Sequence, residues 1–256
     1  MFADIDGNTM HYVSYGEGPP VVFVHGLGGS SNVFHGVMQA MKQHHHCVAL
    51  DLRGHGRSQG RGKFTIEGWA KDVQRLMRHL ELPAVTLVGH SLGTLVAQYL
   101  AQTSPEAVDQ LILIGGISYF QPPTLDAYRD RATLVESEGM DVLVDPWLEG
   151  AVSPQSHAMH SGMVGLLREM FLRNEPQNYA KSCRALAEAP RIRRDEIGQP
   201  TLIVTGAHDR STPLAMSEEL TSSIPVSRVK VLPDVGHWSP LEAPGAVAAT
   251  LLEFLS

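Results

Sequence analysis

Four short segments of the chain are apolar at consecutive positions, which is typical of strands buried on both faces of a sheet. Between them, apolar residues recur three or four positions apart, as in amphipathic helices, for example over 65–80 and 91–103. Strands and helices therefore alternate. This alternation predicts an α/β fold, a mostly parallel sheet with helices on both faces. The four apolar segments are Val21–Val24, Val85–Val88, Leu111–Ile114 and Thr201–Thr205.

The N-terminal segment and a long central segment depart from this alternation. Two strand-like segments, 3–6 and 11–15, flank an Asp-Gly-Asn turn and predict an antiparallel hairpin that starts the sheet. From 118 to 194 no strand-like run occurs, and prolines separate amphipathic pieces rich in Met, Leu and Arg. We therefore expect a helical cap, or lid, inserted into one core domain. The expected parts are a core of residues 1–117 and 195–256, a cap of residues 118–194, and late elements at 213–223 (helix), 228–232 (strand) and 244–255 (helix).

Composition narrows the class of protein. The chain has 256 residues, 43% of them hydrophobic, which suits one sizeable core. The net charge of −7 argues against nucleic acid as a partner, because nucleic-acid binders neutralise phosphates with clustered positive charge. The two cysteines, Cys47 and Cys183, allow no disulfide framework and show no zinc-ligand spacing. The first residues lack the features of a secretory signal, and no apolar run approaches the roughly 20 residues of a membrane span. We expect a cytoplasmic protein with no membrane segment.

The strongest chemical signal is the sequence Gly-His-Ser-Leu-Gly over 89–93, which directly follows a buried strand and begins a helix. At a sharp strand-to-helix turn the serine backbone is strained, and glycines on both sides let the helix start close to the sheet. The free N–H groups at the helix N-terminus favour a developing negative charge. Ser91 is therefore the candidate nucleophile, and an incidental serine in a tight turn is the less favoured interpretation.

A serine hydroxyl needs a base that is held in the correct tautomer by a third group. Asp209 comes shortly after a buried strand, at the carboxyl end where α/β sheets collect functional loops. His237 follows the last predicted strand, beside Gly236. The chain order Ser, Asp, His matches that of hydrolases with a nucleophile elbow. Asp51 and Asp234 remain alternative acids.

The other histidines are less suited to the role of base, because a lone histidine is most often a surface or core residue. The run 44–46 is expected to form a solvated helix end. His25 is interpreted as a structural support for its own loop. The charged loop 51–58 is expected to hold neighbouring loops together and to take no part in the chemistry.

The glycine-rich segment 25–29 follows the first buried strand and can turn its backbone toward the site. We expect the N–H of Leu27 to be one oxyanion donor and the N–H of Leu92, the residue after the candidate nucleophile, to be the other. A flexible surface loop is the alternative, which the preceding buried strand disfavours.

Taken together, these motifs resemble the α/β-hydrolase superfamily over nearly the whole chain outside 118–194. Within it the chain is similar to 3-oxoadipate enol-lactonases, non-haem haloperoxidase-like esterases and meta-cleavage-product hydrolases. The resemblance implies a catalytic triad of Ser91, Asp209 and His237, with the Leu27 and Leu92 amides as oxyanion donors. The motifs that carry it are HGLGG at 25–29, DLRGHGRS at 51–58, GHSLG at 89–93, TGAHDRSTP at 205–213 and VGHWSPLEAP at 235–244.

Some positions limit what the resemblance implies. Dehalogenases and epoxide hydrolases of this fold have Asp at the nucleophile position, where this chain has Ser91. Carbon–carbon bond hydrolases of the fold often have Asn before the nucleophile, where this chain has His90. The tryptophan after the histidine, Trp238, nevertheless resembles the residue found there in that group.

The sequence thus predicts a serine hydrolase that cleaves a small-molecule ester or lactone through an acyl-enzyme on Ser91, as a monomer or homodimer, without metal or cofactor. A carbon–carbon hydrolase with the same triad and a non-catalytic ligand receptor on this fold are the alternatives. Apolar residues of the cap and the core are candidates for the substrate pocket, with ordinary core packing as an equally good explanation. They are Phe34, Trp147, Met163, Met170, Phe171 and Trp238.

Overall fold

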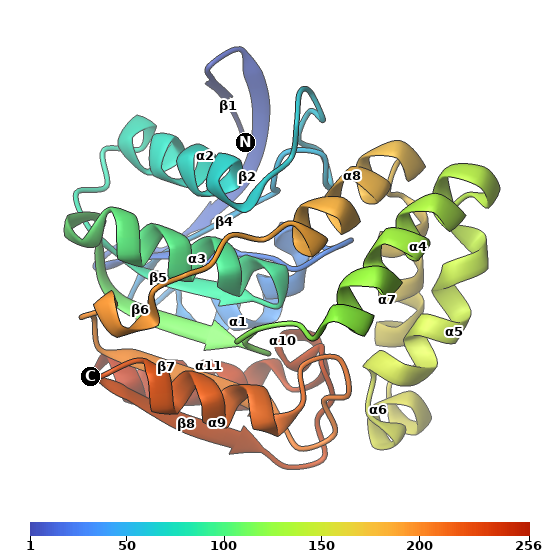
Figure 1. Ribbon diagram of the computed structural model, residues 1–256. Coiled ribbons are helices and arrows are strands. Elements are labelled where there is room, and N and C mark those ends of the chain that lie inside the picture. The colour runs from blue at the N-terminus through green and yellow to red at the C-terminus, as the bar shows by residue number, and fades with distance from the viewer.

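One sheet of eight strands runs through the computed structural model of residues 1–256 (Figure 1). Its strand order is β1-β2-β4-β3-β5-β6-β7-β8. The strands from β3 to β8 are parallel to one another, whereas β1 and β2 form an antiparallel hairpin that pairs with β4. The strands are β1 (Phe2–Ile5), β2 (Asn8–Tyr15), β3 (Pro20–Val24), β4 (His46–Leu50), β5 (Val85–His90), β6 (Val108–Ile114), β7 (Thr201–Gly206) and β8 (Ser227–Leu232).

The apolar segments form the centre of this sheet, as predicted. Every residue of β5 and β7 is buried, because helices cover both faces. The predicted N-terminal hairpin is also present, with Ala3 opposite Met10. At the other edge of the sheet, most residues of β8 are exposed. The mostly parallel α/β fold is therefore confirmed.

Helices lie on both faces of the sheet. Figure 1 shows α2, α3 and α9 in front of it and α1 with α11 behind it, and the pairs α2·α3 and α1·α11 are in contact. None of the helices combines the length and the apolar character needed to cross a membrane. The core helices are α1 (His35–Met41), α2 (Ile66–His79), α3 (Leu92–Thr103), α9 (Leu214–Ser223), α10 (Ser239–Glu242) and α11 (Pro244–Leu255), with short 3-10 helices at Ser31–Phe34, Pro105–Ala107 and Arg194–Glu196.

Helix α2 illustrates how the local sequence sets these elements. Thr65 caps its N-terminus by accepting a hydrogen bond of 3.0 Å from the N–H of Gly68. Its apolar face, which includes Trp69 and Val73, is fully buried against the sheet, consistent with the spacing of apolar residues along the segment. Such burial contributes on the order of 2 kcal/mol for each large side chain.

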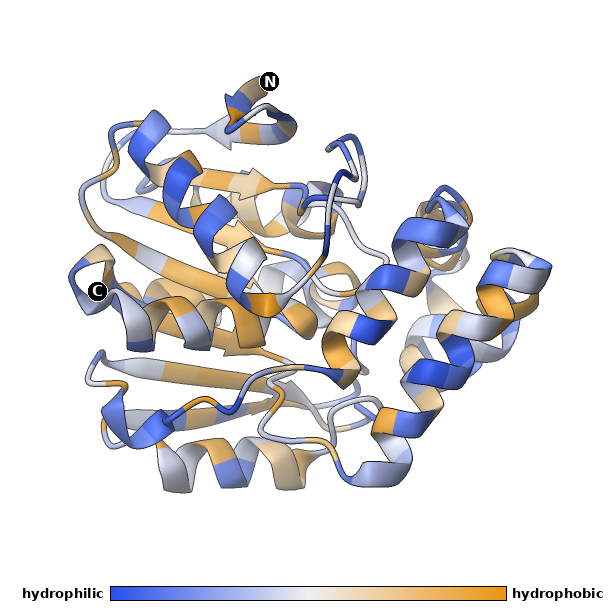
Figure 2. Ribbon diagram, turned by 45° about the horizontal axis from the view of Figure 1, so that its top comes forward, coloured by the Kyte–Doolittle hydropathy of each residue, from blue (hydrophilic) through white to orange (hydrophobic).

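The segment 118–194 contains five α-helices and no strand. Figure 1 shows these helices gathered beyond the end of the sheet toward which the parallel strands point. Helix α4 packs along α8, and α5 packs along α7. Figure 2 shows hydrophobic and hydrophilic residues mixed along these helices, in contrast to the largely hydrophobic central strands. The five are α4 (Pro122–Glu138), α5 (Asp141–Ala151), α6 (Pro154–Met159), α7 (Ser161–Leu172) and α8 (Pro176–Ala187).

One local expectation is wrong. The histidine run 44–46 does not form a solvated helix end, because α1 already ends at Met41 and β4 begins at His46. The Nε2 atom of His46 lies 2.8 Å from the Ser14 hydroxyl on the neighbouring strand. Parallel pairing with β3 extends the strand one residue into the polar run, because its backbone groups gain partners there.

The loops after β3 and β4 are held together by buried polar side chains. The Asp51 carboxylate accepts hydrogen bonds from the backbone N–H groups of Ser31 (2.6 Å) and Arg57 (2.8 Å) and from the His11 ring (2.9 Å). The Nε2 atom of His25 accepts from the N–H of Leu52 at 2.9 Å. Asp51 is therefore engaged in joining loops and does not contact His237, which removes it as an alternative acid.

Three buried histidines should make the fold sensitive to acid. Burial lowers the pKa of His55 and of His90 to about 3, with smaller effects from neighbouring histidines, and it also lowers the pKa of His25. Each unfolded histidine binds a proton near pH 6.5, whereas folded His55 and His90 do not until about pH 3. The unfolded chain thus holds more protons in this window, so stability falls as the pH falls from 6.5 toward 3, by at most about 1.4 kcal/mol per pH unit for each histidine.

Urea unfolding between pH 7 and pH 4.5 measures this effect. We expect His55→Phe, which cannot take up the proton in either state, to have a shallower dependence of the unfolding free energy on pH than the unmodified protein. Equal slopes for the two proteins would contradict the prediction.

Candidate active site

Ser91 lies at the sharp turn between β5 and α3. Its backbone has φ 51° and ψ −119°, a left-handed conformation that non-glycine residues rarely adopt. The turn requires glycine on either side: a Cβ on Gly89 would lie 2.4 Å from the carbonyl oxygen of Gly93, and one on Gly93 would lie 2.1 Å from that of Val24. The spacing of the two glycines around the serine is thus explained by the close approach of α3 to the sheet.

Asp209 and His237 are joined by a direct hydrogen bond. The Nδ1–H of His237 donates to Oδ2 of Asp209 at 2.8 Å, and both side chains are almost completely buried. Oδ1 of Asp209 accepts from the backbone N–H groups of Ser211 (2.9 Å) and Thr212 (2.8 Å). The Thr212 hydroxyl donates to Oδ2 at 2.7 Å. The carboxylate therefore has partners on both oxygens. Because it only accepts hydrogen bonds, it holds the neutral His237 ring in the tautomer that carries the proton on Nδ1.

The pKa of Asp209 reflects two opposing influences. Burial alone would raise this pKa, but the interactions with His237 and with the donors of Thr212 outweigh burial and hold the pKa below its ordinary value. Asp209 is consequently ionised at neutral pH. A buried carboxylate in contact with the ring stabilises positive charge on it.

Asp234, the second alternative acid, lies elsewhere. It is exposed, has a positive φ of 56°, and its carboxylate is 3.9 Å from the His208 ring. It makes no hydrogen bond with His237.

Residues that sequence reasoning missed hold the backbone around His237. The buried Glu242 carboxylate accepts hydrogen bonds of 3.0 Å from the N–H groups of Gly236, Trp238 and Ser153. The N–H of His237 itself donates to the carbonyl of Ala151 at 2.9 Å. Ala151 and Ser153 belong to the inserted helical segment, so the loop that carries His237 is anchored to both parts of the chain. A carboxylate four residues after Trp238, at the end of the short helix α10, was the available signal.

His90 is a second missed contact. Its Nε2–H donates to the carbonyl oxygen of His237 at 2.8 Å, and the two rings lie 4.9 Å apart between centroids. Because His90 directly precedes Ser91, this contact brings the serine turn and the histidine loop together. Its side chain is completely buried and stays neutral at physiological pH, as its pKa of about 3 implies.

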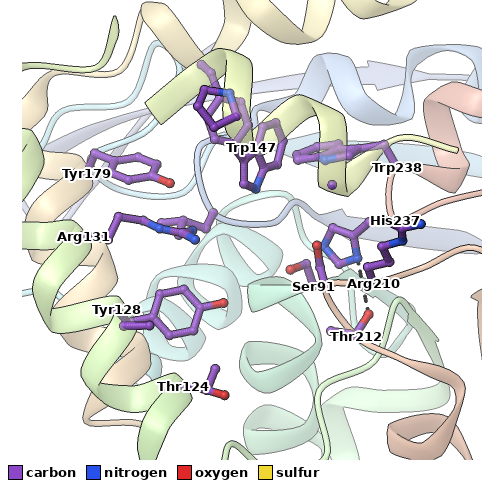
Figure 3. Close-up of a pocket in the computed structure, with 16 residues that line it drawn as sticks. Ser91, Thr124, Tyr128, Arg131, Trp147, Tyr179, Arg210, Thr212, His237 and Trp238 are labelled. Atoms are coloured by element: carbon purple, nitrogen blue, oxygen red, sulfur yellow. Dashed lines mark hydrogen bonds between the residues drawn. The ribbon is translucent and has the colours of Figure 1, made fainter. Parts of the chain in front are cut away.

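Ser91 and His237 line one cavity of about 350 Å³ between the sheet and the inserted helices. Figure 3 shows the Ser91 hydroxyl beside the His237 ring at one end of the cavity, with Tyr128, Arg131 and Tyr179 at the other. Core residues on the wall are Leu27, Ser91, Arg210, Ser211, Thr212, His237 and Trp238, and residues of the inserted helices are Thr124, Ala127, Tyr128, Arg131, Pro146, Trp147, Gly150, Phe171 and Tyr179.

The structure separates the six residues suggested for the pocket. Trp147, Phe171 and Trp238 line the cavity, and the rings of Trp147 and Phe171 stack with centroids 3.8 Å apart. The other three do not line it. Phe34 packs in the core with its ring centroid 5.0 Å from that of Phe23, and Met163 packs against the core.

Met170 is the third residue outside the cavity, and helix geometry explains why. Successive residues of a helix point about 100° apart. When Phe171 faces the cavity, Met170 faces a different one, where the Ser30 hydroxyl lies 3.5 Å from its sulfur.

The two backbone amides expected to bind an oxyanion lie beside Ser91. Leu92 is the first residue of α3, so its N–H has no carbonyl one turn earlier to bind. Leu27 lines the cavity, and its N–H makes no hydrogen bond within the protein. The loop of Leu27 abuts the serine turn so closely that a Cβ on Gly26 would lie 2.8 Å from Cβ of Ser91.

Comparison with known proteins agrees with this architecture. The model of the alpha/beta hydrolase fold family matches residues 19–244. The chain therefore belongs to the alpha/beta hydrolase fold family. It is 28% identical over 244 residues to 3-oxoadipate enol-lactonase 2 of Acinetobacter baylyi, covering 93% of this chain and 90% of that protein.

Solved structures of this hydrolase fold resemble it closely. An enol-lactonase from Burkholderia xenovorans LB400 superposes with a TM-score of 0.94 at 27% identity, over 100% of this chain and 99% of that one. A thermophilic esterase from Thermogutta terrifontis superposes with a TM-score of 0.93 at 27% identity, over 97% of this chain and 93% of that one. The protein is thus a hydrolase of this fold with esterase and lactonase relatives.

Proposed function

We propose that the protein is a serine hydrolase that cleaves carboxylic esters or lactones through an acyl-enzyme on Ser91. The observation that carries the proposal is the buried hydrogen bond of 2.8 Å between Asp209 and His237, at the end of the cavity where the strained Ser91 turn lies. A nucleophile, a base and an orienting acid are the three groups that acyl transfer from a serine requires.

The protonation pattern supports the roles. Because Nδ1–H of His237 donates to Asp209, the unprotonated Nε2 is free to accept the Ser91 proton. The serine oxygen attacks the carbonyl carbon, and the ring becomes an imidazolium beside an ionised carboxylate. The imidazolium then gives its proton to the leaving alkoxide, and the acyl group remains on Ser91.

The negative charge that develops on the carbonyl oxygen needs donors that are already in place. We assign this role to the N–H groups of Leu92, which directly follows Ser91, and of Leu27, whose loop abuts the serine turn. In comparable sites one such donor contributes about 10²- to 10³-fold to the rate. The positive end of the α3 helix dipole acts in the same direction.

Hydrolysis of the acyl-enzyme completes the cycle. A water gives a proton to Nε2 of His237 and attacks the ester carbon, and the Ser91 oxygen leaves with the proton returned by the ring. We propose that the helices of 118–194 act as a lid that limits the access of bulk water, since α4, α5, α7 and α8 supply more than half of the cavity wall.

The relatives support this reaction class. The similar proteins named above are an esterase and two enol-lactonases, which act on carboxylic esters and on cyclic esters respectively. Ester and lactone cleavage share the same acyl chemistry at the serine.

A substrate panel tests the proposal. Short-chain alkyl esters, aryl esters, γ-lactones and acyl homoserine lactones should include at least one class that the protein hydrolyses, and a fluorophosphonate probe should label Ser91. Turnover of vinylogous diketones without any ester hydrolysis would favour the carbon–carbon hydrolase alternative. The tryptophan that follows the candidate base, Trp238, is a feature shared with that group. A folded protein that the probe does not label would favour a ligand receptor.

A further inference from the structure

The charged side chains that line the catalytic cavity are positive, although the chain as a whole is negative. The chain carries a net charge of −7. The 16 residues that line the cavity nevertheless include two arginines, Arg131 and Arg210, and no aspartate or glutamate. Fixed positive charge in a site with partly apolar walls attracts anions and favours their binding.

Arg131 differs from other arginines of the inserted helices. Arg129, Arg168 and Arg184 each form an ion pair with a carboxylate of the same region, at Asp126, Asp145 and Glu136 respectively. The Arg131 guanidinium forms no ion pair and no hydrogen bond to a carboxylate. Its neighbours are aromatic: its central carbon lies 5.3 Å from the centroid of the Tyr128 ring, and its guanidinium donates a hydrogen bond to the Tyr179 hydroxyl.

In this position the arginine has a neutral hydrogen-bond partner but no anionic one. The guanidinium remains charged at any physiological pH, and removing it from water is costly unless an anion compensates. Its planar fork binds a carboxylate through two parallel hydrogen bonds. Figure 3 shows Arg131 between Tyr128 and Tyr179, across the cavity from Ser91 and His237. A carboxylate held there would be at the opposite end of the substrate from the reacting carbonyl.

We propose that Arg131 binds a carboxylate of the substrate, so that the protein acts on small anionic esters or lactones. This inference rests on the proposed hydrolase function. The hydroxyls of Tyr128 and Thr124 lie on the same wall and can donate further hydrogen bonds to the anion. The cavity volume of about 350 Å³ is in the range of sites that bind small molecules.

Matched pairs of substrates test the inference. In one pair the carboxylate is on the acyl side: the mono-4-nitrophenyl ester of adipate against its neutral methyl 4-nitrophenyl diester. In the other pair it is on the alcohol side: 3-acetoxybenzoate against phenyl acetate. We expect kcat/KM of the unmodified protein to favour the anion at least tenfold in one of the pairs, which also identifies the end of the substrate that Arg131 holds.

The arginine variants separate recognition from packing. Arg131→Gln should lower kcat/KM for the preferred anion about 10- to 100-fold, mainly through KM, and change the value for the neutral ester less than threefold. Arg131→Lys should recover part of the loss because it restores the charge. The control is Arg129→Gln, on the exposed side of the same helix, which should leave both substrates unaffected. Equal losses on the anionic and the neutral ester would show a structural role and overturn the inference.

Binding of a dicarboxylate distinguishes this inference from the proposed function. Adipate, titrated calorimetrically, should bind to the unmodified protein and to Ser91→Ala, and binding should weaken at least tenfold in Arg131→Gln. If no ester is hydrolysed but adipate binds through Arg131, the anion site stands and the hydrolase proposal fails. If esters are hydrolysed without preference for an anion and adipate does not bind, the hydrolase proposal stands and the anion site fails.

Discussion

Replacing Ser91 with alanine should lower kcat for every ester or lactone that the protein hydrolyses by about 10⁴-fold or more. The reason is that no other hydroxyl can take the place of a nucleophile held at this turn beside His237. The Ser91 hydroxyl makes no hydrogen bond to another protein group, so the fold loses little with it. We expect the unfolding free energy to change by less than about 0.5 kcal/mol.

The measurement is steady-state hydrolysis together with fluorophosphonate labelling and a urea unfolding curve. Ser222→Ala, at an exposed position on α9, is the matched control and should keep full activity. Hydrolysis that persists in Ser91→Ala at more than a few per cent would mean that the reaction does not proceed through an acyl-enzyme on this serine.

Asp209→Asn should reduce kcat by roughly 10³- to 10⁴-fold without unfolding the protein. Oδ1 of Asp209 accepts two backbone N–H groups, from Ser211 and Thr212, so the carbonyl oxygen of the new amide will keep that side. Its NH₂ group then faces His237 and donates to Nδ1. The proton of the neutral ring moves to Nε2, the atom that must accept the Ser91 proton, and the base is lost.

The matched control is a second Asp-to-Asn substitution, away from His237. Asp234→Asn changes an exposed carboxylate on the neighbouring loop and should alter kcat less than twofold. Circular dichroism and thermal unfolding should show that Asp209→Asn remains folded. An unchanged kcat in Asp209→Asn would indicate that another acid orients the base.

Much of the fold could be predicted because the evidence for it is local. Consecutive apolar residues in β5 and β7 are required by burial on both faces, and this requirement appears directly in the sequence. Gly89 is required by a backbone contact within the same turn, where a Cβ would lie 2.4 Å from the carbonyl oxygen of Gly93. The strand that begins at His46 was harder to place, since its first residue is polar and gains its partner only through pairing with β3.

The candidate site was predictable in part. Chain order and position after strands singled out Asp209 and His237, and the structure joins them by a hydrogen bond. The role of His90 was not visible, because it depends on a backbone atom that is distant in sequence, and the same is true of the contact by which Glu242 anchors the His237 loop to Ser153. The two neighbouring pocket candidates on α7 were separated only by the rotation of the helix, which places Phe171 in the cavity and Met170 outside it.

The sequence by itself determined the alternation of strands and helices in the core, the serine turn and the residue types available for acyl transfer. These features follow from short-range sterics and from the periodicity of burial. The tertiary structure alone decided which side chains meet across the cavity, including the position of Arg131 opposite Ser91 without a carboxylate partner. Contacts of this kind depend on how the inserted helices pack on the sheet, and that packing is set by many weak interactions that no short motif encodes.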